Sequence, residues 1–439
     1  MKKLNKTLLG STLMLLAGVM LLAGLALAGN GNNGNNITPV NCTGNPTDRA
    51  LIQSAISNAR SGDTLVLVGT CQLDGTQVFI TKSNLTITGA GAAGNWSTVV
   101  KGIASGGGTP VGDNGGPTFA LFNRGFQIGD NSGNSQVKNV EIENIKFSTL
   151  HRAVIVSPQI GQVTTQCSGI TVGTGSASSI VVGNNWFDNN DRSAQIFGTA
   201  NNVTFQNNLV TNNTAGEEDF VTIGQLEGCN GGAGFVSPTG IPANSAITGN
   251  SISNGQEGFA PIFIFGSDKI TVANNILSTI GAPFAMIFLS EDSNSNVSNN
   301  QINAGGVATG IYASDFMSAV SGFPPNSSHV QINNNTISNG VPGVAIDSDT
   351  TGYSVINNRF TSSSIADVVL CGTVANAVCD GGTPPSFQNK VVTTNFGNSV
   401  IDNGSNNQLL GTQNLINNSS VPAGVKTKLI GGAVGRPQQ

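Results

Sequence analysis

Apolar and polar residues alternate along most of this chain, in short runs that end at similar turns. Runs such as Ile270-Thr271-Val272 and Val330-Gln331-Ile332 place apolar side chains at every second position, the period of a half-buried β-strand. Most runs lead to a phrase made of an Asn, a variable residue and an apolar residue. The phrase occurs at Asn185-Trp186-Phe187, Asn208-Leu209-Val210, Asn250-Ser251-Ile252, Asn275-Ile276-Leu277, Asn300-Gln301-Ile302, Asn335-Thr336-Ile337 and Asn358-Arg359-Phe360.

The repeated Asn recurs with a nearly constant period. Successive copies are 23, 42, 25, 25, 35 and 23 residues apart, so a base period of 23 to 25 contains two long steps. Such a period indicates a solenoid of stacked repeats. A leucine-rich repeat would need several Leu per repeat, whereas the apolar positions here are mostly Ile, Val and Phe. We therefore predict an all-β fold, a single-stranded parallel β-helix whose coils each contain three short strands and three turns.

The recurrence of Asn at equivalent positions has a structural explanation. Asn tolerates the left-handed backbone conformation of a sharp turn. Stacked copies can also pass amide hydrogen bonds along a ladder. The recurrence therefore predicts turn geometry and no catalytic role.

Residues 47–60 have the pattern of a short amphipathic helix, which Thr47 or Asp48 would cap and residues 61–63 would end. The apolar face consists of Leu51, Ile52, Ala55, Ile56 and Ala59. Because a solenoid must cover its first open hydrophobic face, we expect this helix to cap the N-terminal end of the coils.

The stretch LIQSAISNARSGDTLVLVGTCQLDGTQVFITKSNLTITGAG resembles the opening of right-handed parallel β-helix proteins of the pectin-lyase-like superfamily. A capping helix, a Gly-Asp-Thr turn and a Gly-Ala-Gly segment recur there. The resemblance covers residues 47–91 in motif and 140–410 in repeat pattern. It implies a right-handed helix of coils, and it specifies the fold better than an activity.

The ends of the chain differ in composition from its middle. Residues 1–28 combine a basic start, an apolar stretch and Ala26-Leu27-Ala28, the pattern of a bacterial secretory signal peptide. An uncleaved membrane anchor is the alternative, because the apolar stretch is long enough to span a bilayer. We expect a Gly/Asn-rich linker at 29–46, one β-helix domain at 47–415 and a loose tail at 416–439. After cleavage the protein would be secreted or held at the cell surface, without stable membrane insertion, as a monomer.

Six cysteines fit an exported protein with disulfides. Cys371 and Cys379 bracket one loop and form the favoured pair. Cys42 with Cys71 would pin the first coil and leave Cys167 with Cys229, although six cysteines allow about 15 pairings. A zinc site is disfavoured, because the chain has no Cys-x-x-Cys and its two histidines are His151 and His329.

Charge is scarce in this chain. Charged residues make up 9% of it and the net charge is −5, with no cluster of Lys and Arg. This argues against nucleic acid as a partner. A surface rich in Gly, Asn, Ser and Thr suits a hydroxyl-rich partner, and we predict a polysaccharide.

The scarce charges gather at one offset from the repeated Asn. A strip of candidate catalytic residues follows the Asn by about seven to eleven positions in the N-terminal half, and the same offset in later coils holds Ala282, Val307, Pro342 and Ile365. The candidates are His151, Arg152, Arg192, Glu217, Glu218, Asp219 and Glu257, with Asp191 beside them. A weaker row of acids, Asp268, Asp292 and Asp349, precedes the next Asn and is typical of turn aspartates.

Carboxylates beside arginines allow three functions. Paired acids can hydrolyse a glycosidic bond. As in the pectate lyases that the chain resembles, acids can hold Ca²⁺ while an arginine removes a proton; Glu218, Asp219 and Glu257 would be the ligands. The strip can also bind sugar without reaction. A fourth interpretation is structural, with solvated turn residues paired as surface salt bridges.

The known enzyme motifs of the superfamily are absent. Polygalacturonases carry Asn-Thr-Asp, Asp-Asp and Gly-His-Gly motifs. Residues 217–223 of this chain resemble the Asp-Asp motif only weakly. The Trp-x-Asp-His of pectate lyases is missing. The sequence therefore predicts a β-helix protein that binds polysaccharide and leaves cleavage open, as a lyase or a glycoside hydrolase. The alternative is a non-catalytic surface, adhesion or structural protein.

Overall fold

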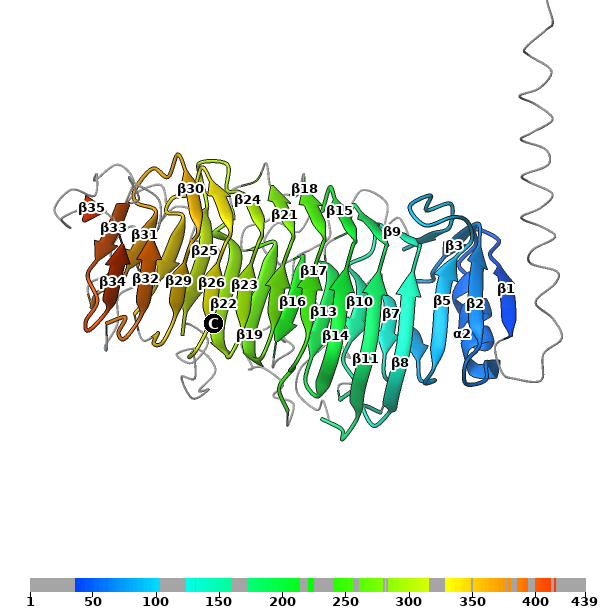
Figure 1. The fold of residues 1–439 in the computed structure, drawn as a ribbon. Coiled ribbons are helices and arrows are strands. Elements are labelled where there is room, and N and C mark those ends of the chain that lie inside the picture. Colours follow the sequence, from blue (N-terminus) through cyan, green and yellow to red (C-terminus); the bar gives the residue numbers. More distant parts are fainter. Residues whose placement is uncertain are drawn as a thin grey trace, which may run out of the picture.

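The computed structural model describes residues 36–102, 124–130, 132–159, 172–190, 192–213, 220–224, 240–253, 255, 260–278, 281, 283–315, 328–348, 350–373, 375, 378–379, 385–393, 399–411 and 414–415. These residues form three parallel sheets and one helix, α2 (Asp48–Asn58). Figure 1 shows the strands of each sheet following one another from α2 at one end to β34 and β35 at the other.

The thirteen-stranded sheet consists of β1 (Ile37–Asn41), β2 (Thr64–Val68), β5 (Leu85–Gly89), β8 (Gln136–Glu143), β11 (Ser176–Gly183), β14 (Ala200–Gln206), β17 (Ala246–Thr248), β20 (Thr271–Ala273), β23 (Asn296–Ser298), β26 (Gln331–Asn333), β29 (Ser354–Ile356), β32 (Lys390–Thr393) and β34 (Gln408–Gly411). The twelve-stranded sheet consists of β4 (Val78–Ile80), β7 (Arg124–Ile128), β10 (Arg152–Val156), β13 (Arg192–Phe197), β16 (Val221–Gly224), β19 (Ile262–Asp268), β22 (Ala285–Ser293), β25 (Thr309–Ser314), β28 (Val344–Ile346), β31 (Val368–Leu370), β33 (Ser399–Asp402) and β35 (Asn414–Leu415). The ten-stranded sheet consists of β3 (Thr70–Gln72), β6 (Val99–Lys101), β9 (Lys146–Ser148), β12 (Trp186–Asp188), β15 (Leu209–Thr211), β18 (Ser251–Ser253), β21 (Ile276–Ser278), β24 (Gln301–Asn303), β27 (Thr336–Ser338) and β30 (Arg359–Thr361).

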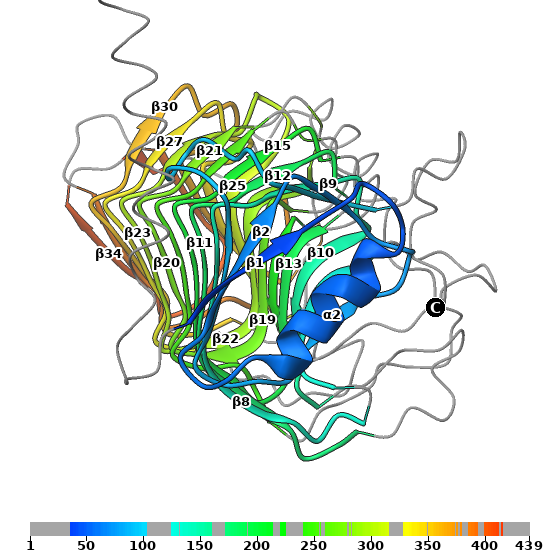
Figure 2. The same ribbon diagram turned by 90° about the vertical axis from the view of Figure 1, so that its right-hand side faces the viewer.

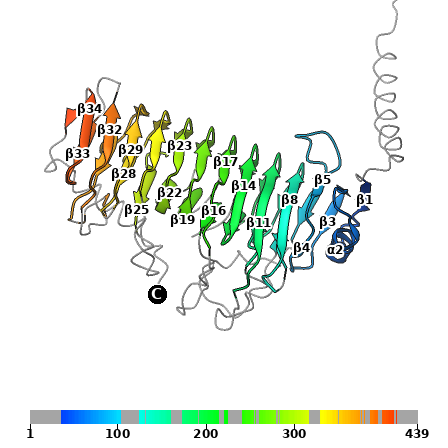
Figure 3. The ribbon, with the colours of Figure 1, turned by 60° about the horizontal axis from the view of Figure 1, so that its bottom comes forward.

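One coil takes one strand from each sheet, for example β11, then β12, then β13. Strands of successive coils pair in parallel, so equivalent residues stack at the strand spacing of about 4.8 Å. Figure 3 shows this stacking for β16, β19, β22 and β25 of the twelve-stranded sheet. The predicted all-β, right-handed parallel β-helix is confirmed.

A continuous apolar core fills the coils. It runs from Val40 in β1 to Val400 in β33, and it takes alternate residues of most strands. In β11, for example, Ile180 and Val182 are buried in this core, whereas Ser178 and Ser179 are partly exposed. The alternation that predicted strands is therefore the alternation between interior and exterior.

The repeated Asn residues form the predicted ladder. The backbone N–H of each donates to the side-chain oxygen of the next, at 2.9–3.0 Å from Asn185 through Asn358. Each side-chain amide also donates to a main-chain carbonyl of the preceding coil, as Asn275 does to Ile247 at 2.9 Å. All seven are buried. The ladder thus satisfies backbone groups that the turn would otherwise leave unpaired inside the protein.

The left-handed conformation lies one residue before the ladder, which corrects our assignment of it to the ladder Asn. The residues with positive φ are Asn184, Asn207, Gly249, Asn274, Asn299, Asn334 and Asn357, with φ between 53° and 67°. The Asn-Asn pairs of the sequence therefore divide two tasks. The first Asn makes the turn, and the second bonds the coils together.

Helix α2 lies across the N-terminal end of the coils, as Figure 2 shows. It contacts β1, β3 and β4, and Ile52 and Ile56 are fully buried, as expected of a cap. Leu51, which we placed on the apolar face, is 41% exposed. Asp48 accepts hydrogen bonds from the N–H groups of Thr43, Gly44 and Gln72, so it ties the helix to the segment before it and to β3.

Part of the expected linker belongs to the fold. Residues 37–41, inside the interval 29–46, form β1, which pairs with β2 along its whole length. Val40 is buried in the core. The alternation in this strand is weak, and Asn and Gly surround it, which is why its composition indicated a linker.

Two of the predicted disulfides are present, Cys42–Cys71 and Cys371–Cys379. The first joins the segment after β1 to β3 and so closes the first coil. Cys167 and Cys229 lie outside the described residues, as do the signal-peptide and tail intervals. No helix within the described part of the chain is long and apolar enough to cross a membrane.

Candidate functional site

The outer face of the twelve-stranded sheet carries a second set of buried side chains. In β13, Ala194 and Ile196 belong to the interior core, so Gln195 and Phe197 between and after them face outward. Strand pairing extends the outward column of Gln195 in both directions. Its members are Phe79, Gln127, Ile155, Gln195, Thr222, Phe263, Phe288, Tyr312, Ala345, Val369 and Ile401. The polar members Gln127, Gln195 and Thr222 all lie in the earlier coils, and the column from Phe263 onward has no charged or amide side chain.

Three arginines begin successive strands at the polar end of this sheet. Arg124, Arg152 and Arg192 are the first residues of β7, β10 and β13, and they pair with one another in register. Arg124 is 4% exposed, Arg152 is 1% exposed and Arg192 is partly buried. His151 is buried too, and its carbonyl accepts the N–H of Arg192 at 2.7 Å. Guanidinium groups repeated at strand spacing favour anionic groups beside them.

The structure brings three residues of the predicted strip together, namely His151, Arg152 and Arg192. The burial of His151 and Arg152 rules out the interpretation of these two as solvated turn residues. Glu217, Glu218, Asp219 and Glu257, three of them our candidate Ca²⁺ ligands, lie outside the described residues, as does Asp191. The carbonyl of Phe220 accepts the N–H groups of Ser193 and Ala194, so Phe220 lies beside the strand that Arg192 begins.

Sequence reasoning missed Arg124. It lies in the interval 90–136, where the repeat is interrupted and an offset from the repeated Asn has no meaning. A local signal was available, because Arg124-Gly125-Phe126-Gln127-Ile128 matches Arg192-Ser193-Ala194-Gln195-Ile196 in its Arg, its Gln and its apolar positions. Both segments form paired strands of one sheet.

Aromatic rings lie on the outer face of the same sheet in the later coils. Phe263 stacks on Phe288 with ring centroids 5.1 Å apart, and Phe288 meets Tyr312 edge-on at 5.2 Å. Phe284 contacts Tyr312 at 4.6 Å. These rings belong to a second hydrophobic cluster, separate from the interior core, that continues to Ile401. The outer face of the twelve-stranded sheet therefore carries closely packed side chains in its later coils.

Gly224 makes room for one of these rings. A Cβ at Gly224 would lie 2.1 Å from the ring of Phe265 in the next coil, and that ring is stacked on Phe263 at 4.7 Å. We expect Gly224→Ala to lower the free energy of unfolding by about 1–3 kcal/mol through overpacking. The matched control is Gly183→Ala in β11, whose Cβ would meet the movable side chain of Gln206 at 3.2 Å. Chemical denaturation of both variants tests this, and equal costs would contradict it.

Carboxylates lie at the ends of three later strands of this sheet. Glu291 lies within β22, Asp315 follows β25 and Asp347 follows β28, so the three acids are on successive coils. They are 4%, 5% and 2% exposed, respectively. Asp347 accepts the hydroxyl of Tyr312, and Glu291 accepts that of Ser290 at 2.6 Å. The sequence-based strip did not include these acids.

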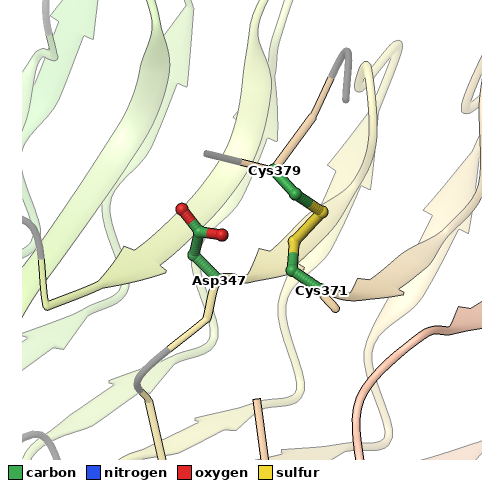
Figure 4. A group of neighbouring side chains, drawn as sticks. All are labelled: Asp347, Cys371 and Cys379. Carbon is green, nitrogen blue, oxygen red and sulfur yellow. A yellow bond between two sulfur atoms is a disulfide. The ribbon is translucent and has the colours of Figure 1, made fainter. Parts of the chain in front are cut away.

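Asp347 lies beside the Cys371–Cys379 disulfide (Figure 4). A carboxylate oxygen of Asp347 and the two sulfur atoms all lie within 4.8 Å of one another, which is close enough for three ligands of one metal ion. Both sulfurs are bonded to each other, however, so neither is available as a thiolate. In this oxidised form the group is a carboxylate packed against a disulfide.

Tyr312 lies on this outer face, whereas Trp186 and Tyr353 lie elsewhere. Trp186 is on the ten-stranded sheet, with the ammonium of Lys146 3.6 Å from its ring centroid and Trp96 at 5.6 Å. Tyr353 is buried in the interior core.

Comparison with known proteins supports the fold. No protein-family model matches the chain, and no curated protein matches its sequence. Among solved structures, an alginate lyase from Paenibacillus sp. str. FPU-7 is similar with a TM-score of 0.52 and 14% identity, over 74% of this chain and 95% of that one. DFA-IIIase from Arthrobacter chlorophenolicus A6 in complex with GF2 is similar with a TM-score of 0.51 and 16% identity, over 89% of this chain and 96% of that one.

At this level of identity the similarity concerns the fold. The chain is a right-handed parallel β-helix protein with the pectin-lyase-like fold, as the resemblance of its opening segment implied.

Proposed function

We propose that this protein is carbohydrate-active, and that it binds a polysaccharide on the outer face of the twelve-stranded sheet and cleaves it there. The observation that carries the proposal is the row Arg124, Arg152 and Arg192, with His151 and Gln195 beside it. These groups are buried or partly buried in a chain in which charged residues are only 9%. Sugar sites combine a few fixed polar groups with apolar or aromatic surface, and this face has both.

The two similar structures add support, since one is an alginate lyase and the other is DFA-IIIase. For a lyase, the arginines would bind the carboxylates of the substrate and lower the cost of removing the proton next to them. Ca²⁺ held by Glu218, Asp219 and Glu257 would likewise bind the substrate carboxylates and lower the cost of removing that proton. For a hydrolase, two carboxylates would act as acid and as base or nucleophile. The candidates are the acids at 217–219 and, further along the sheet, Asp347.

We also propose that the protein works outside the cell as a monomer. Disulfides persist in oxidising compartments, and Cys42–Cys71 and Cys371–Cys379 both support export. The signal peptide at 1–28 would direct it there, and its cleavage can be read from the N-terminus of the exported protein.

The experiment is a panel of alginate, polygalacturonate, xylan and inulin, each with and without Ca²⁺. Unsaturated products absorb in the ultraviolet and report a lyase, whereas new reducing ends without that absorbance report a hydrolase. We expect Arg192→Ala to weaken binding of the active glycan about 10- to 100-fold, because it loses charge-assisted hydrogen bonds. Glu218→Gln should lower product formation.

The matched control is Arg359→Ala, which removes an exposed arginine on the ten-stranded sheet and should leave binding unchanged. Absence of both binding and product with every glycan would reject the proposal. It would favour the alternative, a rigid surface or adhesion protein in which the regular Asn ladder and continuous core serve to make a rod.

A further inference from the structure

Gln195 is a buried side chain whose amide makes no hydrogen bond to the residues that the structure describes. It is 0% exposed and faces outward in β13, between Ile155 of the preceding coil and Thr222 of the next. Neither its Oε1 nor its Nε2 has a hydrogen-bond partner among the described residues. Buried amides are nearly always hydrogen-bonded, since an unmade bond costs the full price of desolvation.

The equivalent glutamine two coils earlier is different. Gln127 occupies the same outward column, and its Oε1 accepts the Nε2 of Gln77 at 3.2 Å. The chain can therefore satisfy a glutamine at this position, as it does at Gln127, but none of the described residues does so at Gln195. Ile155, its neighbour on one side, has no side-chain group to offer.

A second polar group with the same property is close to Gln195 in the sheet. Ser157 follows β10 directly, is 1% exposed, and its hydroxyl has no partner within the described part of the chain. By register it stands opposite Phe197, two residues beyond Gln195. Two unsatisfied groups on adjacent coils, with the arginine row at the start of the same strands, point to a ligand that supplies their partners.

We infer that Gln195 is a specificity-determining residue of the proposed polysaccharide site. Its carboxamide binds two neighbouring hydroxyl groups of one sugar ring. The inference rests on the proposed function. A carboxamide presents one acceptor and one donor side by side, and adjacent ring hydroxyls can satisfy both at once.

The test is Gln195→Met, which keeps the length of the side chain and removes both polar groups. In the absence of glycan we expect this variant to melt roughly 2 °C higher than the wild type, because it buries no unsatisfied amide. Its affinity for the glycan that the wild type binds, among alginate, polygalacturonate, xylan and inulin oligosaccharides, should fall at least about 10-fold. Stability and binding are thus expected to change in opposite directions.

Gln127→Met is the matched control for stability, because it removes a satisfied amide from the same column and should lower the melting temperature. A Gln195→Met variant that melts lower than the wild type, or fails to fold, would overturn the inference by showing that the amide is satisfied within the protein. Unchanged affinity would also overturn it, as expected if a buried water bonds to the amide. If the wild type binds no glycan, the proposed function fails first, and the melting temperatures still report whether the amide is unsatisfied.

Discussion

Replacing Asn275 by Gly is expected to lower the free energy of unfolding by on the order of 4 kcal/mol, since it breaks the ladder near its centre. The side-chain oxygen of Asn275 accepts the N–H of Asn250 at 3.0 Å and its Nδ2 at 2.9 Å. Its own Nδ2 donates to Asn300 and to the carbonyl of Ile247, both at 2.9 Å. All three Asn residues are buried, so water cannot replace these bonds without opening the turn.

The same change one residue earlier is the control. Asn274 is exposed and has a φ of 58°, a conformation that Gly adopts without strain. The preceding coil already carries Gly249 at this position, with a φ of 67°. We expect Asn274→Gly to change stability by less than about 1 kcal/mol. Chemical denaturation of the two variants provides the comparison, and similar losses would show that the ladder adds little beyond the turn.

This pair of residues also shows why the fold was predictable. A ladder needs the same side chain on every coil, and a tight turn accepts few residue types, so both leave a repeated letter in the sequence. The apolar core leaves a second signal, because each strand must present alternate residues to the interior. The sequence could not assign the two tasks within each Asn-Asn pair, since either residue tolerates the turn.

The site was less predictable, because its register is set by strand pairing and the segments that join the sheets differ in length. Gln195 lies 10 residues after Asn185, whereas Thr222 lies 14 residues after Asn208, and yet the two residues pair. A fixed offset of seven therefore follows the sheet only where the connection is short, as at Arg152 and Arg192. The fixed offset did not identify Arg124 or Asp347. In later coils it selected residues such as Ala282 and Pro342, which precede β22 and β28 in the sequence.

The same error of register explains the acidic row. Asp268 and Asp292 have similar offsets from the next Asn, but Asp268 pairs with Ser293, and Asp292 pairs with Ser267. Because side chains alternate across a strand, a shift of one residue places the two carboxylates on different sides. Asp268 is partly exposed and bonded to Asn294 at 2.7 Å, whereas Asp292 is fully buried.

Asp292 is expected to make the stability of the protein fall as the pH rises toward 7. Burial raises the pKa of its carboxyl to about 7, and the charge of Asp268 adds to this, against hydrogen bonds from Ser295 at 2.7 Å and Ser267 at 3.0 Å. Its Oδ2 has no partner among the residues that the structure describes. Between the ordinary pKa of an aspartate near 3.8 and this raised value, the folded state holds a proton that the unfolded chain releases.

The sign follows from that difference. The folded state binds more protons than the unfolded chain, so stability is highest below the unfolded pKa, declines as the pH rises through the interval, and is lowest above the folded pKa. Asp292→Asn removes the ionisation and keeps an acceptor for the two serines. We expect this variant to be more stable than the wild type at pH 8 by on the order of 4 kcal/mol, and the advantage to disappear near pH 4.

Asp188 on the ten-stranded sheet is the control, because its pKa is shifted in the other direction. Burial alone would raise it, but the hydrogen bonds from Lys146, Asn212 and Thr211, together with the Lys146 charge, outweigh burial and hold the pKa below its usual value. Asp188→Asn should therefore be less stable than the wild type at pH 7, and the gap should close as the pH falls below 4. Melting temperatures of both variants between pH 2 and 9 test the opposite slopes. An Asp292→Asn curve parallel to that of the wild type would mean that the buried carboxylate stays ionised, held by a cation or a solvent contact that offsets its burial.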